Sequence, residues 1–166
     1  MPQISRREPV FYSFHYDNDV FRVQQIRNMG VVDGEEPVSA NEWEQLKRKG
    51  STAIENWIAD NMKYRRCVVV LIGSDTSTRP WVKHEIKTAW EQKKGLLGIY
   101  IHNLKCPRTG QCAKGANPFL NWDVGTQSMA HLVSAHDPNP YDAYGDISRN
   151  LQGWVATAIA QAASRK

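Results

Sequence analysis

Residues 67–92 read CVVVLIGSDTSTRPWVKHEIKTAWEQ, and this stretch decides the fold. Cys67–Ile72 is an uninterrupted apolar run whose length and β-branched content are typical of a buried strand. A polar loop follows, and Pro80 then begins a helical pattern, since proline is well tolerated in the first turn of a helix. Glu85 lies in the second turn. We therefore expect its side chain to face the loop at the carboxyl end of the strand, where open α/β sheets bind ligands.

Strand and helix signals alternate on both sides of this stretch. Apolar runs predict strands at residues 10–14 and 95–102; residues 30–34 are either a short strand or a loop, and 131–133 are a candidate last strand. Helical spacing of apolar residues recurs at 20–26, 53–62 and 151–162. The alternation predicts one α/β domain over residues 9–166, after a flexible N-terminus at 1–8. We expect a flavodoxin-like fold with a central parallel sheet and helices on both faces.

A flavodoxin-like strand order has a switch point between the first strand and the central strand. Residues 14–16 (FHY) directly follow the first strand, and the loop at 74–79 follows the central one. Because the carboxyl ends of parallel strands meet at one edge, we expect these two segments to lie together beside Glu85. The sequence thus predicts that two distant polar segments converge at the switch point.

The composition limits the classes of function. The 166-residue chain is 41% hydrophobic and 23% charged, which is typical of a globular domain able to bury one core. No apolar run approaches the roughly 20 residues of a membrane span, and the N-terminus lacks the apolar segment of a signal peptide, so we expect a cytoplasmic protein without membrane contact. Three cysteines form no disulfide framework. The net charge of +4 comes from basic residues scattered along the sequence, which favours solvated helix ends over nucleic-acid binding.

Residue spacing leaves two interpretations of Glu85 open. In the first, Glu85 is an exposed helical glutamate that is stabilised by the positive end of the helix or by a nearby cation, namely Arg79, Lys83 or Lys87. In the second, it is a carboxylate that stays ionised near neutral pH. Such a group would stabilise a developing cation, for example an oxocarbenium ion at a ribose, as glycosidase carboxylates do.

Other residue types that carry chemistry support weaker hypotheses. His15 follows a strand, where a histidine is either structural or a general acid or base. His102, Cys106 and Cys112 lack the spacing of a zinc site, so we expect no metal. No serine lies in a GxSxG elbow, which argues against a serine hydrolase. Trp81 lies beside the 74–79 loop and is a candidate wall for a flat ring.

Several motifs at compatible spacings resemble a known family. VFYSFHY at 10–16 resembles the first-strand box of Toll/interleukin-1 receptor (TIR) domains, and IGSDTSTRPWVKHEI at 72–86 resembles their S-x-W-x-x-E segment. Together with the Phe21-Arg22 pair, Glu42-Trp43-Glu44 and KGANPF at 114–119, they resemble the TIR-like ThsB proteins of bacterial Thoeris anti-phage defence. The resemblance covers roughly residues 9–120.

This resemblance implies a TIR-like fold that consumes NAD as its substrate and needs no further cofactor. In catalytic members, the glutamate of the W-x-x-E segment, which matches Glu85 here, serves in cleaving the bond between nicotinamide and ribose. Phe14, His15 and Trp81 would line the nicotinamide or ribose end of the site, and Asn117 would reach in from a long loop. The product would be an ADP-ribose-derived signal, commonly a cyclic isomer, that activates a separate effector protein after phage infection.

The sequence departs from the TIR pattern at two places. The R-D-x-x-P-G run of the animal BB loop is absent, with Glu35-Glu36-Pro37 in roughly that region, and Val82 replaces the cysteine of W-C-x-x-E. Two alternatives stay open. A non-catalytic TIR-like scaffold would act through protein–protein assembly, as a homo-oligomer or with a phage-derived trigger. A CheY-like receiver would need an aspartate at the end of the central strand, where Ser74 stands.

Overall fold

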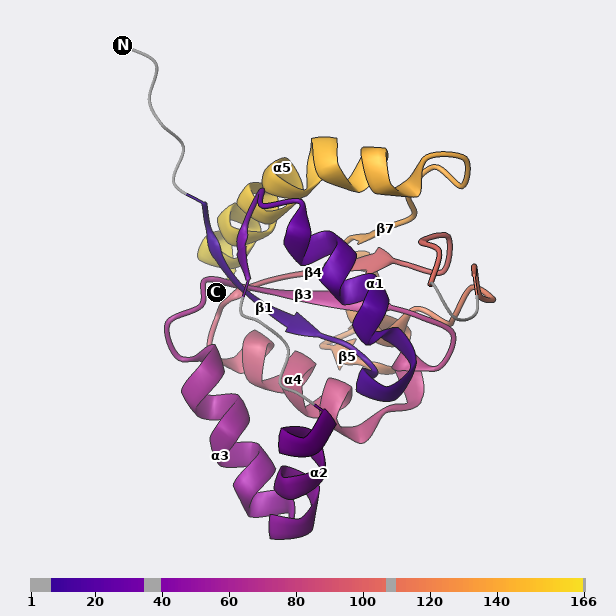
Figure 1. The fold of residues 1–166 in the computed structure, drawn as a ribbon. Helices are drawn as coiled ribbons and strands as arrows, with labels where there is room; N and C mark the ends of the chain where they lie inside the picture. The colour runs from indigo at the N-terminus through magenta and orange to yellow at the C-terminus, as the bar shows by residue number, and fades with distance from the viewer. Residues whose placement is uncertain (1–6, 35–39, 107–109, 166) are drawn as a thin grey trace.

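The computed structural model describes residues 7–34, 40–106 and 110–165, and its centre is a five-stranded sheet (Figure 1). The strands are β1 (Pro9–Ser13), β2 (Asp33–Gly34), β3 (Cys67–Ile72), β4 (Gly95–Tyr100) and β7 (Ala135–His136). They lie in the order β2-β1-β3-β4-β7, and every neighbouring pair is parallel. This is the predicted flavodoxin-like α/β order, with its switch point between β1 and β3.

Helices cover both faces of the sheet, as predicted. One face is covered by α1 (Tyr16–Asn28) and α5 (Ala143–Ser164), and the other by α3 (Ser51–Met62) and α4 (Pro80–Glu91). The remaining helix, α2 (Ala40–Lys49), packs against α3. The sheet therefore separates two hydrophobic layers, which we call the α1–α5 layer and the α3–α4 layer.

The central strand, β3, has six buried side chains in succession. Cys67, Val69 and Leu71 belong to the α1–α5 layer, and Val68, Val70 and Ile72 belong to the α3–α4 layer. Burial on both faces explains why this run shows no alternation of polar and apolar residues. Each large aliphatic side chain buried in this way contributes about 1.5–3 kcal/mol to folding.

A glycine at the start of β4 lets α5 approach the sheet closely. A Cβ atom added to Gly95 would lie 2.9 Å from the backbone nitrogen of Ile159, which is closer than side-chain atoms pack. Any larger residue at this position would push α5 away from the sheet. The close contact places the C-terminal helix over β3 and β4 in the α1–α5 layer.

The long segment after β4 contains more regular structure than the sequence indicates. Before β7 it forms the 3-10 turns η2 (Pro118–Asn121) and η3 (Met129–His131) and a hairpin of β5 (Asp123–Val124) and β6 (Gln127–Ser128). The prediction of a strand at 131–133 is wrong. Val133 is apolar because it is buried in the α3–α4 layer. The chain reaches the sheet edge only at Ser134, whose carbonyl accepts from Gly98 N–H at 2.8 Å.

Two predictions concern residues beyond those described. Residues 1–6 of the expected flexible N-terminus and the Glu35-Glu36-Pro37 segment both lie outside the described residues. Glu8 is described, and its carboxylate pairs with Arg66 at 2.8 Å. Of residues 30–34, Asp33 and Gly34 pair with β1 as β2.

Cysteine labelling tests the central position of β3. Cys67 and Cys106 are buried, and Cys112 is half-buried. Burial, with a smaller contribution from Glu8, raises the pKa of the Cys67 thiol to about 12, so its reactive thiolate is scarce at neutral pH. We expect iodoacetamide to modify Cys112 in the native protein and Cys67 only after unfolding, as measured by peptide mass spectrometry. Rapid native labelling of Cys67 would contradict this placement.

Candidate functional site

Glu85 lies on the side of α4 that faces the sheet. Pro80 is the first residue of the helix, and the buried residues Val82, Glu85, Ile86 and Ala89 follow at helical spacing. Only 7% of Glu85 is exposed. The interpretation of Glu85 as an exposed helical glutamate is therefore wrong, because its position falls on the apolar stripe of the helix.

A serine at the end of β1 binds the Glu85 carboxylate. The Ser13 hydroxyl donates a hydrogen bond to Glu85 Oε1 at 2.8 Å, and Ser13 is 1% exposed. Side chains alternate along β1: Val10 and Tyr12 pack in the α1–α5 layer, whereas Phe11 packs in the α3–α4 layer. Ser13 comes two residues after Phe11, so its side chain lies on the same face of the sheet and points toward α4. The motifs in the sequence point to serines only as possible nucleophiles, whereas the alternation along β1 is the signal for this role of Ser13.

The loop between β3 and α4 is closed by Thr76, at the start of the 3-10 turn η1 (Thr76–Thr78). Gly73 N–H donates to Thr76 Oγ1 at 2.8 Å, and this hydroxyl donates to the Leu71 carbonyl at 3.4 Å. In the same loop, Asp75 Oδ2 accepts from Asn18 Nδ2 at 3.3 Å. The start of α1 therefore contacts the loop after β3, as expected for a switch point.

A second segment crosses the carboxyl end of β3. Gly115 packs so closely on Gly73 that a Cβ atom added to Gly115 would overlap the Gly73 carbonyl oxygen. Asn117 follows, and its Oδ1 accepts from Phe119 N–H at 2.9 Å, which caps η2. Since η2 contacts η1, Asn117 lies near the loop that precedes α4. Its contact with a substrate stays a prediction.

Aromatic rings surround the end of β1. Phe14 stacks on Tyr16 with 6.0 Å between ring centroids, and Tyr16 stacks on Trp43 of α2 at 5.8 Å. Phe14 packs against the α1–α5 layer, so it lies on the opposite face of the sheet from Ser13. His15 is half-buried and is the N-cap residue of α1. The roles of Phe14 and His15 in lining the site stay predictions.

Trp81 lies in the first turn of α4, on the same helix as Glu85. It is half-buried against the α3–α4 layer, and its ring meets the His84 ring edge-on, with 5.7 Å between centroids. Partial exposure at the helix start is consistent with a wall for a flat ring. This role also stays a prediction.

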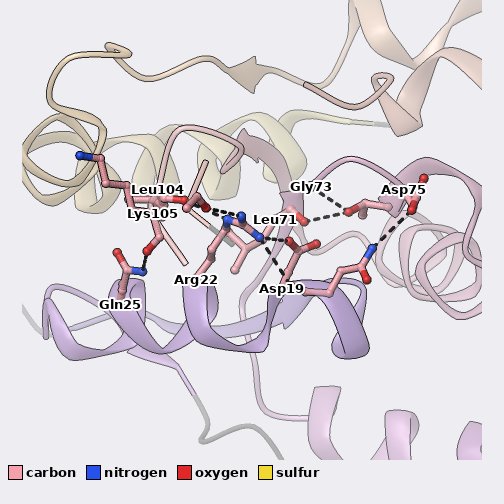
Figure 2. A network of polar contacts seen from close by, with 11 residues as sticks. Asp19, Arg22, Gln25, Leu71, Gly73, Asp75, Leu104 and Lys105 are labelled. Atoms are coloured by element: carbon pink, nitrogen blue, oxygen red, sulfur yellow. Dashed lines mark hydrogen bonds and ion pairs between the residues drawn. The ribbon is translucent and has the colours of Figure 1, made fainter. Parts of the chain in front are cut away.

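A buried arginine, paired with an aspartate on the same helix, links elements near the switch point (Figure 2). Arg22 Nη1 donates to Asp19 Oδ1 at 3.0 Å, and both side chains are almost completely buried. Arg22 also donates from Nε to the Leu104 carbonyl at 2.9 Å and from Nη2 to the Gly110 carbonyl at 2.8 Å. Burial raises the pKa of Asp19, although the Arg22 guanidinium lowers it. Asp19 and Arg22 both lie on α1, and the two bonds from Arg22 to the Leu104 and Gly110 carbonyls therefore link α1 to the segment that follows β4.

The described residues contain no cluster of side chains suited to binding a metal ion. Within them, no group of three or more His, Cys, Asp or Glu side chains could hold a metal ion. Burial lowers the pKa of His102, which favours the neutral imidazole. Among the described helices, none has the length and apolar character required to cross a membrane.

Comparison with known proteins connects this geometry to a family. The model of the family described as "Thoeris protein ThsB, TIR-like domain" matches residues 11–106, which is more than half of the chain. The chain belongs to the ThsB TIR-like family. The matched range contains both Ser13 and Glu85, so the two residues joined at the switch point lie inside the ThsB TIR-like domain. Asn117 lies beyond the matched range.

A curated relative provides a second ThsB comparison. The protein named "Putative cyclic ADP-D-ribose synthase ThsB1" from Bacillus cereus (strain MSX-D12) is 34% identical over 115 residues. The alignment covers 66% of this chain and 60% of the relative, so this chain matches less than two thirds of the relative's length.

Replacing Arg22 tests whether the buried ion pair holds the site together. Arg22→Leu leaves the Asp19 carboxylate buried without its cation, which we expect to cost about 3–5 kcal/mol in the free energy of unfolding. The matched control is Arg149→Leu, which removes an exposed pair with Asp142 and should cost less than about 1 kcal/mol. Urea denaturation followed by circular dichroism measures both. Equal, small losses would show that the Arg22 pair does not hold this region.

Proposed function

We propose that this protein cleaves NAD between nicotinamide and ribose and converts the remainder into an ADP-ribose-derived signal, a cyclic ADP-ribose isomer. The buried hydrogen bond between Ser13 and Glu85, at the carboxyl ends of β1 and β3, is the observation that carries the proposal. Membership of the ThsB TIR-like family supports it. The name of the Bacillus cereus relative, which describes a cyclic ADP-D-ribose synthase, points to the same chemistry.

The geometry around Glu85 suits this reaction. When the glycosidic bond breaks, its electron pair leaves with nicotinamide, which becomes neutral, and positive charge develops on the ribose. A fixed carboxylate in a poorly solvated site stabilises that charge far more strongly than a carboxylate in water. Glu85 is such a group, since it is 7% exposed and accepts a hydrogen bond from Ser13.

The fate of the ribose cation determines the product. Attack by a nucleophilic atom of the bound ADP-ribose itself closes a ring, whereas attack by water gives free ADP-ribose. Exclusion of water around the cation favours ring closure. In this proposal the cyclic product leaves the protein and activates a separate effector in the cytoplasm, after a phage-derived trigger or self-assembly switches the enzyme on.

Burying a carboxylate in an apolar layer lowers the stability of the fold. Desolvation of a charge lowers stability unless partners compensate for it, and an apolar residue at the same position would pack without that cost. Val82, Ile86 and Ala89 show that this face of α4 is otherwise apolar. A catalytic role explains why a carboxylate occupies position 85.

Substitution of Glu85 tests the proposal. Glu85→Gln keeps the size of the side chain and removes its charge, so we expect nicotinamide release from NAD to fall below about 1% of wild type while the fold is retained. Release is measured by liquid chromatography and mass spectrometry in lysates of phage-infected cells that express each variant. Thermal unfolding measured by circular dichroism reports the fold.

The matched control is Glu91→Gln on the same helix. Glu91 is exposed and pairs with Lys87 at 3.9 Å, so this variant should release nicotinamide at the wild-type rate. Wild-type turnover in Glu85→Gln would overturn the assignment of Glu85. Absence of nicotinamide release from wild type in infected cells would instead favour a non-catalytic scaffold that acts through protein–protein assembly.

A further inference from the structure

The hydrogen bond between Ser13 and Glu85 lies beside the apolar α3–α4 layer. Ser13 pairs with Val70 in the register of β1 and β3. Val70 and Ile72 of β3, together with Val82 and Ile86 of α4, form the α3–α4 layer around this point. The buried Ser13 hydroxyl is therefore a polar group beside this apolar layer, and it donates to Oε1 of Glu85.

A hydroxyl in this position has two effects on the carboxylate. It fixes Oε1 at the carboxyl end of β1, and thereby selects one orientation of a side chain that has three rotatable bonds. It also favours the ionised form, because a hydrogen bond to a charged acceptor is stronger than the same bond to a neutral one.

We propose that Ser13 is a positioning residue, whose hydroxyl orients Glu85 toward the ribose and keeps its carboxylate ionised at neutral pH. The inference rests on the proposed cleavage of NAD for its catalytic consequence. The effect on Glu85 itself is a property of the folded chain and is measurable without substrate. Ser13 acts through Glu85 and is not assigned a contact with NAD.

Two substitutions at Ser13 separate the hydroxyl from the space that it fills. Ser13→Ala removes the donor and leaves a similar volume. Ser13→Thr keeps the donor and suits a strand. The matched control is Thr88→Ala on α4, which removes a hydroxyl that donates to the His84 carbonyl at 2.8 Å within the helix.

The first measurement is the titration of Glu85 by carbon-13 NMR of its side-chain carboxyl in the full chain, with Glu85→Gln used to assign the signal. In Ser13→Ala we expect protonation to occur about one to two pH units higher than in wild type, which is the effect of losing a hydrogen bond to a charged group. Ser13→Thr should restore most of the wild-type midpoint, and Thr88→Ala should not change it.

Other ionisable groups lie on the elements packed around α4. They include Tyr100 on β4, His15 after β1, Asp75 and Arg79 on either side of η1, and Lys83, His84, Lys87 and Glu91 on α4 itself. None of them is altered in the variants. A change of midpoint between Ser13→Ala and Ser13→Thr therefore reports the hydroxyl.

The second measurement is the pH profile of nicotinamide release. Ser13→Ala should lower kcat about 10- to 100-fold at neutral pH, with KM for NAD changed less than about threefold, and should move the acidic limb of the profile to higher pH. An unchanged Glu85 midpoint in Ser13→Ala, or equal defects in Ser13→Ala and Ser13→Thr, would overturn the inference. If the midpoint moves as expected but no variant, wild type included, releases nicotinamide, Ser13 still positions Glu85 and the proposed function fails.

Discussion

Six consecutive buried side chains in β3, Cys67–Ile72, constrain how the rest of the chain is arranged. A strand that is apolar on both faces must lie inside a parallel sheet with helices on each side. That requirement places β1 and β4 on its two edges and α4 against one of its faces. Because β1 and β3 flank the switch point, Ser13 and Glu85 meet although they are 72 positions apart in the sequence.

The sequence predicts the sheet, its central strand and the place of Glu85, because periodicity and proline position report directly on local structure. It does not reveal that Glu85 is buried, since spacing alone cannot tell how deeply a helix packs. Ser13 was missed for a different reason: its partner is distant in the sequence, although alternation along β1 gives its direction. The prediction of a strand at 131–133 is wrong because Val133 is apolar for a different reason: its side chain packs in the core.

The two ends of the sheet carry different chemistry. The helices run opposite to the strands, so their C-terminal ends gather at the edge of the sheet where the strands begin, the amino edge. Cations are stabilised there by the negative end of the helix dipole. There Lys94 donates to the Arg65 carbonyl at 2.6 Å, and Arg165 donates to the Lys94 carbonyl at 2.7 Å. Burial lowers the pKa of both Lys94 and Arg165. These basic residues bind the carbonyls of the connections that lead into β3 and β4, whereas Glu85 and the long segment with Asn117 occupy the carboxyl edge.

We propose that the ribose of NAD meets Glu85 at the carboxyl edge between β1 and β3. A crystal structure of Glu85→Gln with uncleaved NAD bound tests it most directly. We expect the ribose carbon bonded to nicotinamide to lie against the side chain at position 85, beside Ser13, with Asn117 at the same edge. NAD bound elsewhere on the protein, with its ribose away from position 85, would show that Glu85 does not meet the ribose.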